Sequence, residues 1–144
     1  MKHSSTGART LAQGDYETLA QFRYLLRRFG AFSQEAARAA GLSAQQHQAL
    51  LAIKGFPGGG ELSIGELAER LNSRHHSVVG LAHRLAARGL IARRRDRADR
   101  RRVLVRLTPR AQALLLRLSL AHKDELRRLA PLLQELLRKL AAAG

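Results

Sequence analysis

Between residues 62 and 88 the apolar positions follow two short helical patterns that are separated by a polar break. In the first pattern they recur at i, i+3, i+4 and i+7, namely at Ile64, Leu67, Ala68 and Leu71. Ser63 stands just before this pattern and Glu66 three residues later, which is the spacing of a capping box. We therefore predict a helix from Ile64 and a turn at Asn72-Ser73, which also supplies an N-cap candidate for the second helix.

The second pattern, from Arg74 to Arg88, has one apolar face and one small, polar and basic face. The apolar face consists of Val78, Leu81, Ala82 and Leu85. The opposite face holds His76, Ser77, Gly80, His83, Arg84 and Ala87. Small residues let a helix approach base edges closely, and arginine, histidine and serine carry donors for guanine or phosphate acceptors. The pattern indicates a helix that enters a DNA groove and ends at Gly89.

A strand pattern and a run of charges follow the second helix. Alternation with a period of two predicts a strand with one buried face at Val103, Leu104, Val105, Arg106 and Leu107. The apolar pair Leu90-Ile91 begins an earlier strand, and residues 95–102 are too charged to lie in a core. We therefore predict a β-hairpin with a basic tip.

The apolar residues outside this region predict further helices. A leading helix near residues 15–40 has apolar positions at Tyr16, Leu19, Phe22, Leu25, Leu26 and Phe29. Another helix is expected from Leu42 to Ile53. A long helical region follows Pro109, and we expect Pro131 to end it before a final short helix.

The composition suffices for one domain, residues 1–144, because 45% of the chain is hydrophobic. Its centre is the helix-turn-helix and hairpin module, residues 42–108. The flanking segments 11–40 and 109–144 are too apolar to remain solvated and too long to pack on that module alone. We therefore expect them to be dimerisation helices of a two-fold homodimer.

The sequence gives no sign of a membrane or an oxidising compartment. No apolar run approaches the ~20 residues needed to cross a bilayer, and the N-terminus lacks the apolar core of a secretory signal. The chain has no cysteine, which excludes disulfides, cysteine-ligated zinc and thiol-based sensing. We expect a cytoplasmic protein without a membrane partner.

The charge is concentrated in the predicted hairpin. From Arg84 to Arg106 there are ten arginines and two aspartates, so this segment carries +8 of the net charge of +15. Such a surface is typical of nucleic-acid binding. All aromatic residues precede residue 57, so the basic module has none with which to stack unpaired bases. This favours double-stranded DNA over RNA or single strands.

Enzymatic and metal-binding classes find little support. No nucleophile has a plausible base and orienting group, and the carboxylates are scarce and dispersed, so neither catalytic residues nor a cofactor are expected. His76 and His83 share a helix face, but without cysteine or a nearby carboxylate at ligand spacing we expect no metal. Residues 54–60 are rich in glycine but lack the Gly-Lys-Ser/Thr ending of a phosphate-binding loop, and we interpret them as a connector.

Taken together, these segments resemble the MarR family of bacterial winged-helix repressors. The resemblance is carried by Gly89-Leu90-Ile91 with Arg93, by Asp99-Arg100-Arg101, and by Val105-Arg106-Leu107-Thr108. It implies a mainly α fold with a small β-hairpin wing, that is, a winged helix-turn-helix with N- and C-terminal dimerisation helices. Where members often carry an acidic residue, this chain has His83, and Gly80 stands where a larger polar residue is common.

The resemblance also implies a function. It suggests a sequence-specific transcriptional regulator, a repressor released by a small-molecule effector, that binds an inverted repeat in double-stranded DNA as a homodimer. The suggested effectors are small anionic aromatic molecules. The alternative function is a nonspecific basic nucleic-acid-binding protein without effector control.

The candidate site residues follow from the patterns and the resemblance. The reading helix would contact DNA through Arg74, His75, His76, Ser77, Gly80, His83 and Arg84. The wing would contribute Arg95, Arg97, Asp99, Arg100 and Arg101, with an arginine entering a minor groove and Asp99 bracing one of them. The candidates for an effector pocket are Phe22, Phe29, Phe32 and His47, although a place in the core or in an interface is the simpler interpretation of these residues.

Overall fold

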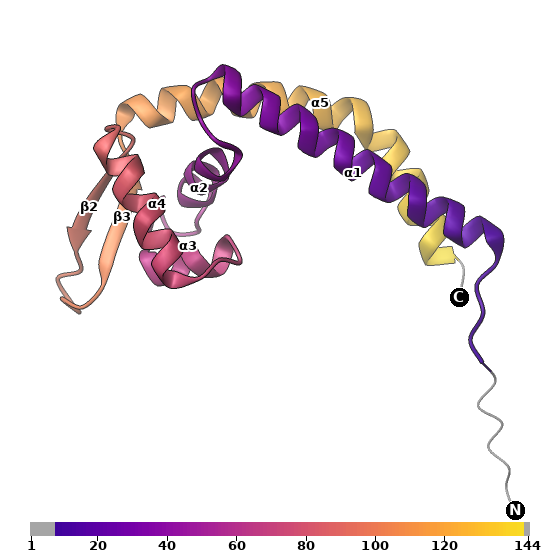
Figure 1. Cartoon of the computed structure of the whole chain (residues 1–144), viewed down its shortest axis with the longest axis horizontal. Coiled ribbons are helices and arrows are strands. Elements are labelled where there is room, and N and C mark those ends of the chain that lie inside the picture. The colour runs from indigo at the N-terminus through magenta and orange to yellow at the C-terminus, as the bar shows by residue number, and fades with distance from the viewer. Residues whose placement is uncertain (1–7, 143–144) are drawn as a thin grey trace, which may run out of the picture. The chain divides into compact units, whose positions relative to one another are not determined.

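The computed structural model of the chain describes residues 8–142, which form five helices and three strands (Figure 1). In chain order the elements are α1 (Gln13–Ala39), α2 (Ala44–Lys54), β1 (Glu61–Ser63), α3 (Ile64–Arg70), α4 (His75–Ala87), β2 (Ile91–Arg95), β3 (Val103–Leu107) and α5 (Pro109–Ala142). The predicted fold class, mainly helical with a small β wing, is confirmed. Residues 32–123 form one compact unit, here called the central unit. The segments up to residue 31 and from residue 124 form a second one, called the terminal unit.

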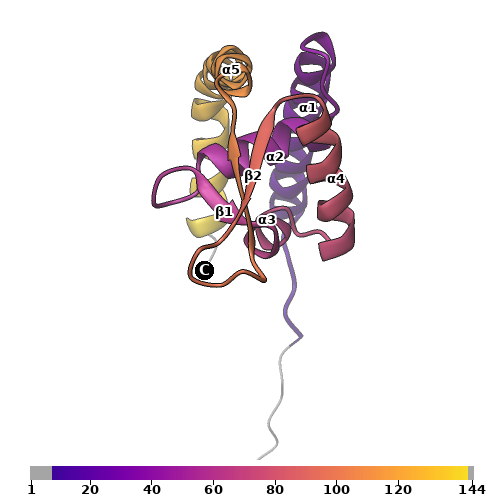
Figure 2. The ribbon, with the colours of Figure 1, turned by 90° about the vertical axis from the view of Figure 1, so that its left-hand side faces the viewer.

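An antiparallel sheet with the order β1-β3-β2 anchors the central unit. Strands β2 and β3 form the predicted hairpin, with Ile91 opposite Leu107 and Arg95 opposite Val103. Figure 2 looks onto this sheet, and α2, α3 and α4 all contact it. The inner side chains of the sheet join the buried faces of these helices in one core, which includes Leu50, Ile53, Leu62, Leu67, Leu81, Leu85 and Val105.

Strand β1 is an element that the sequence patterns did not predict. It has three residues, pairs with β3, and ends at Ser63, which is also the N-cap of α3. A strand this short shows no alternation of apolar and polar residues that could distinguish it from a loop. Only its pairing with β3, more than forty residues later in the chain, makes it a strand.

The local signals for α3 and for the end of α4 are confirmed. Ser63 Oγ accepts a hydrogen bond from the Glu66 backbone N–H at 3.1 Å, and Glu66 Oε1 accepts one from the Ser63 N–H at 3.0 Å, which completes the capping box. Gly89 follows α4 with a φ of +70°, the left-handed conformation that favours glycine.

The expected N-cap of α4 at Asn72-Ser73 is wrong. Arg74 occupies the N-cap position, and its side chain makes no capping hydrogen bond. Asn72 has a φ of +50° and the Ser73 hydroxyl donates to the Leu71 carbonyl at 3.2 Å, so the turn itself uses the backbone of Asn72 and the side chain of Ser73. The first N–H groups of α4 therefore have no side-chain cap from their own N-cap residue.

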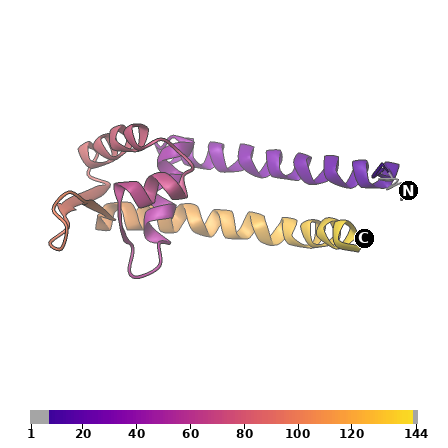
Figure 3. The same cartoon turned by 90° about the horizontal axis from the view of Figure 1, so that it is seen from below.

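The predicted break at Pro131 is also wrong, because α5 continues through this residue to Ala142 (Figure 3). Proline removes one backbone hydrogen bond and crowds the preceding turn, which costs about 3 kcal/mol in a helix interior. The apolar positions Leu129, Leu133 and Leu136 nevertheless keep helical spacing across the proline, and all three are at least partly buried. Burial of this continuous stripe offsets the local cost.

The terminal unit buries little and exposes much of its apolar surface. Leu25 and Leu136 are buried in it. Its exposed large apolar side chains are Leu11, Tyr16, Leu19, Tyr24, Leu26, Leu126, Leu132 and Leu137. No described helix combines the length and the hydropathy that crossing a bilayer requires.

Replacing the cap of α3 tests the origin of the helix-turn-helix. We expect Ser63→Ala to lower the free energy of unfolding by about 1 kcal/mol, because it removes the acceptor for the Glu66 N–H. Urea unfolding of the full chain at fixed protein concentration measures this. Ser77→Ala, at an exposed position in the first turn of α4, is the control and should change stability by less than about 0.5 kcal/mol. Equal losses in the two variants would contradict the capping role.

Candidate nucleic-acid interface

Helix α4 presents its predicted polar face to solvent. Val78, Leu81, Ala82 and Leu85 are at most 1% exposed, so the apolar face is fully used by the core. Exposed residues of α4 and its N-cap are Arg74, His75, His76, Ser77, His83 and Arg84, and Gly80 is half-buried. Because α4 contains no acidic residue, its exposed surface favours an anion. The exposure agrees with the sequence pattern, and contact with DNA remains a prediction.

Two aspartates order the wing between β2 and β3. Asp96 accepts a hydrogen bond from the Ala98 N–H at 2.9 Å, and Asp99 accepts one from the Arg101 N–H at 3.1 Å. Arg95, expected in the tip, is the last residue of β2, and its guanidinium donates to the Arg100 carbonyl at 2.9 Å. These local bonds hold a tip composed largely of arginine in a defined turn.

The wing arginines divide into braced and free side chains. Asp99 braces Arg101 as predicted, through Nε at 3.2 Å, although the Arg101 side chain stays 92% exposed. The side chains of Arg97 and Arg100 make no hydrogen bond or ion pair with any residue in the described part of the chain. Among the wing arginines they are the side chains most available to a phosphate or a groove.

Two ion pairs that sequence reasoning missed connect the wing to the rest of the central unit. Arg102 Nη2 donates to Glu66 Oε1 at 2.7 Å, and Arg94 Nε donates to Glu61 Oε2 at 3.0 Å. The pKa of Glu66 lies below its usual value, chiefly through hydrogen bonds from the Ser63 backbone and hydroxyl, with Arg102 adding to the effect. Since the partners are more than thirty residues apart, no local spacing signals them.

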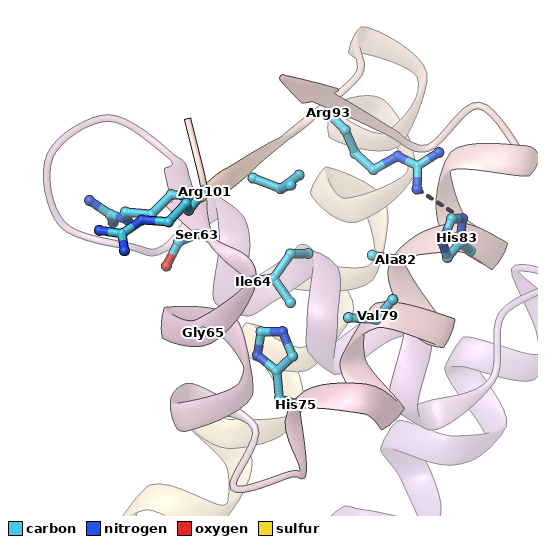
Figure 4. A pocket seen from close by; sticks show the side chains of 11 residues that line it. Ser63, Ile64, Gly65, His75, Val79, Ala82, His83, Arg93 and Arg101 are labelled. Atoms are coloured by element: carbon cyan, nitrogen blue, oxygen red, sulfur yellow. Dashed lines mark hydrogen bonds between the residues drawn. The ribbon is translucent and has the colours of Figure 1, made fainter. Parts of the chain in front are cut away.

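A cavity of about 450 Å³ separates α4 from the wing (Figure 4). Its charged or titratable lining residues are His75, His83, Arg93, Arg101 and Arg102, and its apolar lining comes from Ile64, Val79, Ala82 and Val103. Arg93 Nη1 lies 2.9 Å from His83 Nδ1, which ties β2 to the exposed face of α4. None of the residues that line the cavity is a carboxylate, so α4 and the wing share one positive concave surface.

The four candidates for an effector pocket do not all lie in one compact unit. Phe22 and Phe29 belong to the terminal unit, and Phe32 and His47 to the central unit. In the central unit the ring of His122 contacts both Phe32, at 5.3 Å between centroids, and His47, at 4.7 Å. His122 also donates from Nδ1 to the Leu118 carbonyl at 2.7 Å.

His47 is a buried histidine with an unsatisfied nitrogen. It is 3% exposed, and its Nδ1 has no hydrogen-bond partner among the described residues. Burial lowers the pKa of His47, and the neighbouring His122 lowers it further. Both effects favour the neutral imidazole. Within residues 8–142 no three histidine, aspartate or glutamate side chains are grouped closely enough to hold a metal ion.

Comparison with known proteins identifies the architecture. The sequence model of the MarR family matches residues 40–102. A probable transcriptional regulator from Pseudomonas aeruginosa is 30% identical over 83% of this chain and 92% of its own, with a TM-score of 0.60. No curated protein matches the chain.

Two further solved structures share the fold. AbsC, a MarR family transcriptional regulator from Streptomyces coelicolor, is 19% identical over 94% of this chain and 92% of its own, with a TM-score of 0.75. A single-residue mutant of S. aureus MepR, bound to an oligodeoxyribonucleotide, is 18% identical over 87% of this chain and 96% of its own, with a TM-score of 0.67.

Two glycine substitutions should have opposite effects on stability. Gly80→Ala places a Cβ 3.3 Å from Arg84 Nη1, the flexible end of a side chain, and should raise the free energy of unfolding by about 0.5–1 kcal/mol. Gly89→Ala should lower it by about 1 kcal/mol or more, because the φ of +70° strains a residue with a Cβ. Urea unfolding of both variants measures this, and a loss of stability in Gly80→Ala would show that Arg84 cannot move aside.

Burial of His47 predicts an acid-sensitive fold. Because the folded pKa is lowered from 6.5, the unfolded chain binds this proton at a higher pH than the folded chain. Stability from this source is present above about pH 6.5 and is lost as the pH falls toward the folded pKa. His47→Gln should reduce the loss of unfolding free energy between about pH 7.5 and 5.5. Exposed His76→Gln is the control, and an unchanged slope in His47→Gln would refute the assignment.

Proposed function

Because the chain belongs to the MarR family of transcriptional regulators, which bind DNA, we propose that it acts as a homodimeric repressor on an inverted repeat. Helix α4 is the reading helix of this proposal and the β2–β3 hairpin is its wing. A small molecule would release the dimer from its operator. The solved complex of MepR with an oligodeoxyribonucleotide has the same fold and supports DNA as the partner.

The observation that best supports DNA binding is the exposed basic face of α4 beside a basic wing. The core occupies the apolar face of α4, so its polar side chains stay exposed on the other side. His75 and His83 of α4 line the same cavity as Arg101 and Arg102 of the wing (Figure 4). Helix and wing are therefore close enough to contact one duplex segment, the helix at base edges and the wing at phosphates or a minor groove.

The half-buried glycine on α4 supports a close approach to DNA. A Cβ at Gly80 would lie 3.3 Å from Arg84 Nη1, so the guanidinium of Arg84 folds back over the glycine. A small residue at this position lets the helix backbone and its basic side chains lie near base edges. Gly80 thereby contributes to groove binding through its small size, although it has no side-chain donor.

The exposed leucines and tyrosines of the terminal unit support a dimer. Large apolar patches on a soluble protein mark interaction sites, and the exposed residues lie on both chain ends that form this unit. A second copy offers the same surface and closes a two-fold interface. Two reading helices related in this way would meet successive major grooves about 34 Å apart, which calls for an inverted repeat.

Release by an effector would use aromatic groups of the central unit. The buried His47 has one nitrogen without a partner among the described residues, and Phe32 lies against the same His122 ring. These groups suit an aromatic molecule with a polar substituent. An effector releases DNA only if it binds the DNA-incompetent form of the dimer more tightly.

Selection from a randomised duplex library tests the proposed function. At near-physiological salt the selected duplexes should share an inverted repeat whose half-sites are about one helical turn apart. The selected duplex should bind at least about 10³-fold more tightly than its scrambled counterpart. Equal affinity for both, with equal salt dependence, would leave only a nonspecific basic protein.

Alanine variants of the wing arginines should distinguish a groove contact from a phosphate contact on the selected operator. Arg100→Ala and Arg101→Ala should each weaken binding by about 1–3 kcal/mol if the side chain reads a groove, with relaxed base preference there. If the side chain meets only a phosphate, binding should weaken for all duplexes, and the slope of log affinity against log salt should fall by about 1. Arg38→Ala, which removes an exposed arginine of α1, controls for net charge. Unchanged affinity and slope in both wing variants would remove the wing from the interface.

A further inference from the structure

The contact between Arg93 and His83 joins a wing strand to the reading helix. Arg93 lies on β2 and His83 on the exposed face of α4, with 2.9 Å between Arg93 Nη1 and His83 Nδ1 (Figure 4). A guanidinium has only donors. His83 Nδ1 must therefore be the acceptor in this hydrogen bond.

This direction determines where the His83 proton lies. A neutral imidazole has one N–H, and its other nitrogen is an acceptor. With Nδ1 accepting from Arg93, the proton sits on Nε2. His83 is exposed, and its Nε2 has no hydrogen-bond partner within the part of the chain that the structure describes. An oriented N–H donor is thus left on the surface assigned to DNA.

We propose that Arg93 is a positioning residue that holds His83 as a donor-only contact to DNA. The inference rests on the proposed function, in which α4 is the reading helix. In this tautomer His83 Nε2–H can donate to guanine N7 or O6 or to a phosphate oxygen, and it cannot accept from the amino groups of cytosine or adenine. Arg93 therefore contributes to base choice, or to backbone register, without touching the base itself.

The hydrogen bond from Arg93 to His83 requires a neutral imidazole ring. Protonation would turn an N–H toward Arg93 and break the bond, because both partners would be donors. The other titratable or charged residues that line the cavity are His75, Arg101 and Arg102. None of them is an acceptor anion that could take over from Nδ1 as the partner of Arg93.

Arg93 and its neighbour Arg94 form a matched pair for testing. Both are exposed arginines of β2, and their side chains leave opposite faces of the strand. Arg94 bonds to Glu61 on β1 and Arg93 to His83 on α4. Arg93→Ala and Arg94→Ala thus remove the same charge, and only the first frees His83.

Nitrogen NMR of the free, full-length protein tests the tautomer without DNA. At about pH 8, where histidine is neutral, ¹⁵N-histidine-labelled wild type should show His83 protonated on Nε2, with the signal assigned by its loss in His83→Ala. In Arg93→Ala the His83 signals should move toward a mixture of tautomers, and in Arg94→Ala they should stay. An Nδ1–H tautomer in wild type, or no change in Arg93→Ala, overturns the inference whatever the protein binds.

Binding to the selected operator tests the use of that donor. If His83 donates to guanine, replacing that guanine by 7-deazaguanine, which lacks the N7 acceptor, or by 2-aminopurine, which lacks O6, should weaken wild type about tenfold and leave His83→Ala unaffected. If it donates to a phosphate, His83→Ala should weaken binding equally on all duplexes. In either case Arg93→Ala should add little once His83 is alanine, relative to its effect in wild type, whereas Arg94→Ala should act independently. Wild-type affinity and base preference in His83→Ala, or full additivity with Arg93→Ala, overturns the role in DNA contact.

Failure of the two proposals can be told apart. If no inverted repeat is selected but His83 shows the Nε2–H tautomer and responds to Arg93→Ala, the regulator proposal fails and the Arg93 brace stands. If a repeat is selected and the tautomer does not depend on Arg93, the regulator stands and the further inference fails.

Discussion

Burial of one face of α4 is the constraint on which the functional surface depends. Val78, Leu81 and Leu85 are fixed in the core between the sheet and the other helices, which leaves the helix no freedom to rotate about its axis. The packing of these apolar residues consequently determines the direction in which the polar residues of α4 point. The core therefore sets the direction of the basic face, because the polar residues stand on the side of the helix that the core leaves exposed.

The second constraint is charge. The segment from Arg84 to Arg106 holds ten arginines, and such a density disfavours a compact state through mutual repulsion. A few carboxylates in the folded chain compensate part of this positive charge. Glu61 and Glu66 bind arginines at the base of the wing, and Asp96 and Asp99 order its tip. Exposed pairs of this kind contribute little stability individually. Their effect is to determine which arginines are occupied and which, such as Arg97 and Arg100, remain available.

Histidine adds a different kind of control. Burial beside His122 lowers the pKa of His47, and His83 Nδ1 accepts a hydrogen bond from Arg93. The same residue type thus contributes to the core and to the surface. In each position the ring takes its role from a neighbour on another helix or strand.

The sequence by itself determined the elements whose signals are local. Periodicity located α3, α4 and the hairpin, the Ser63–Glu66 spacing marked the start of α3, and Gly89 marked the end of α4. These features depend on residues within one or two turns of each other, so a pattern of a few positions is sufficient. The helical pattern also gave the exposed residues of α4, and the sequence suggested that Asp99 braces one of the wing arginines, which the structure shows to be Arg101.

Only the tertiary structure decided what depends on distant partners. Strand β1 exists because β3 pairs with it, and α5 passes Pro131 with an apolar stripe that is at least partly buried on both sides. The contacts of Glu61 with Arg94, Glu66 with Arg102 and His83 with Arg93 bring together different elements. Their energies arise when the fold brings the groups within about 3 Å, and nothing in local spacing encodes that approach. The sequence therefore supplied the donors and acceptors, and the fold determined which of them pair.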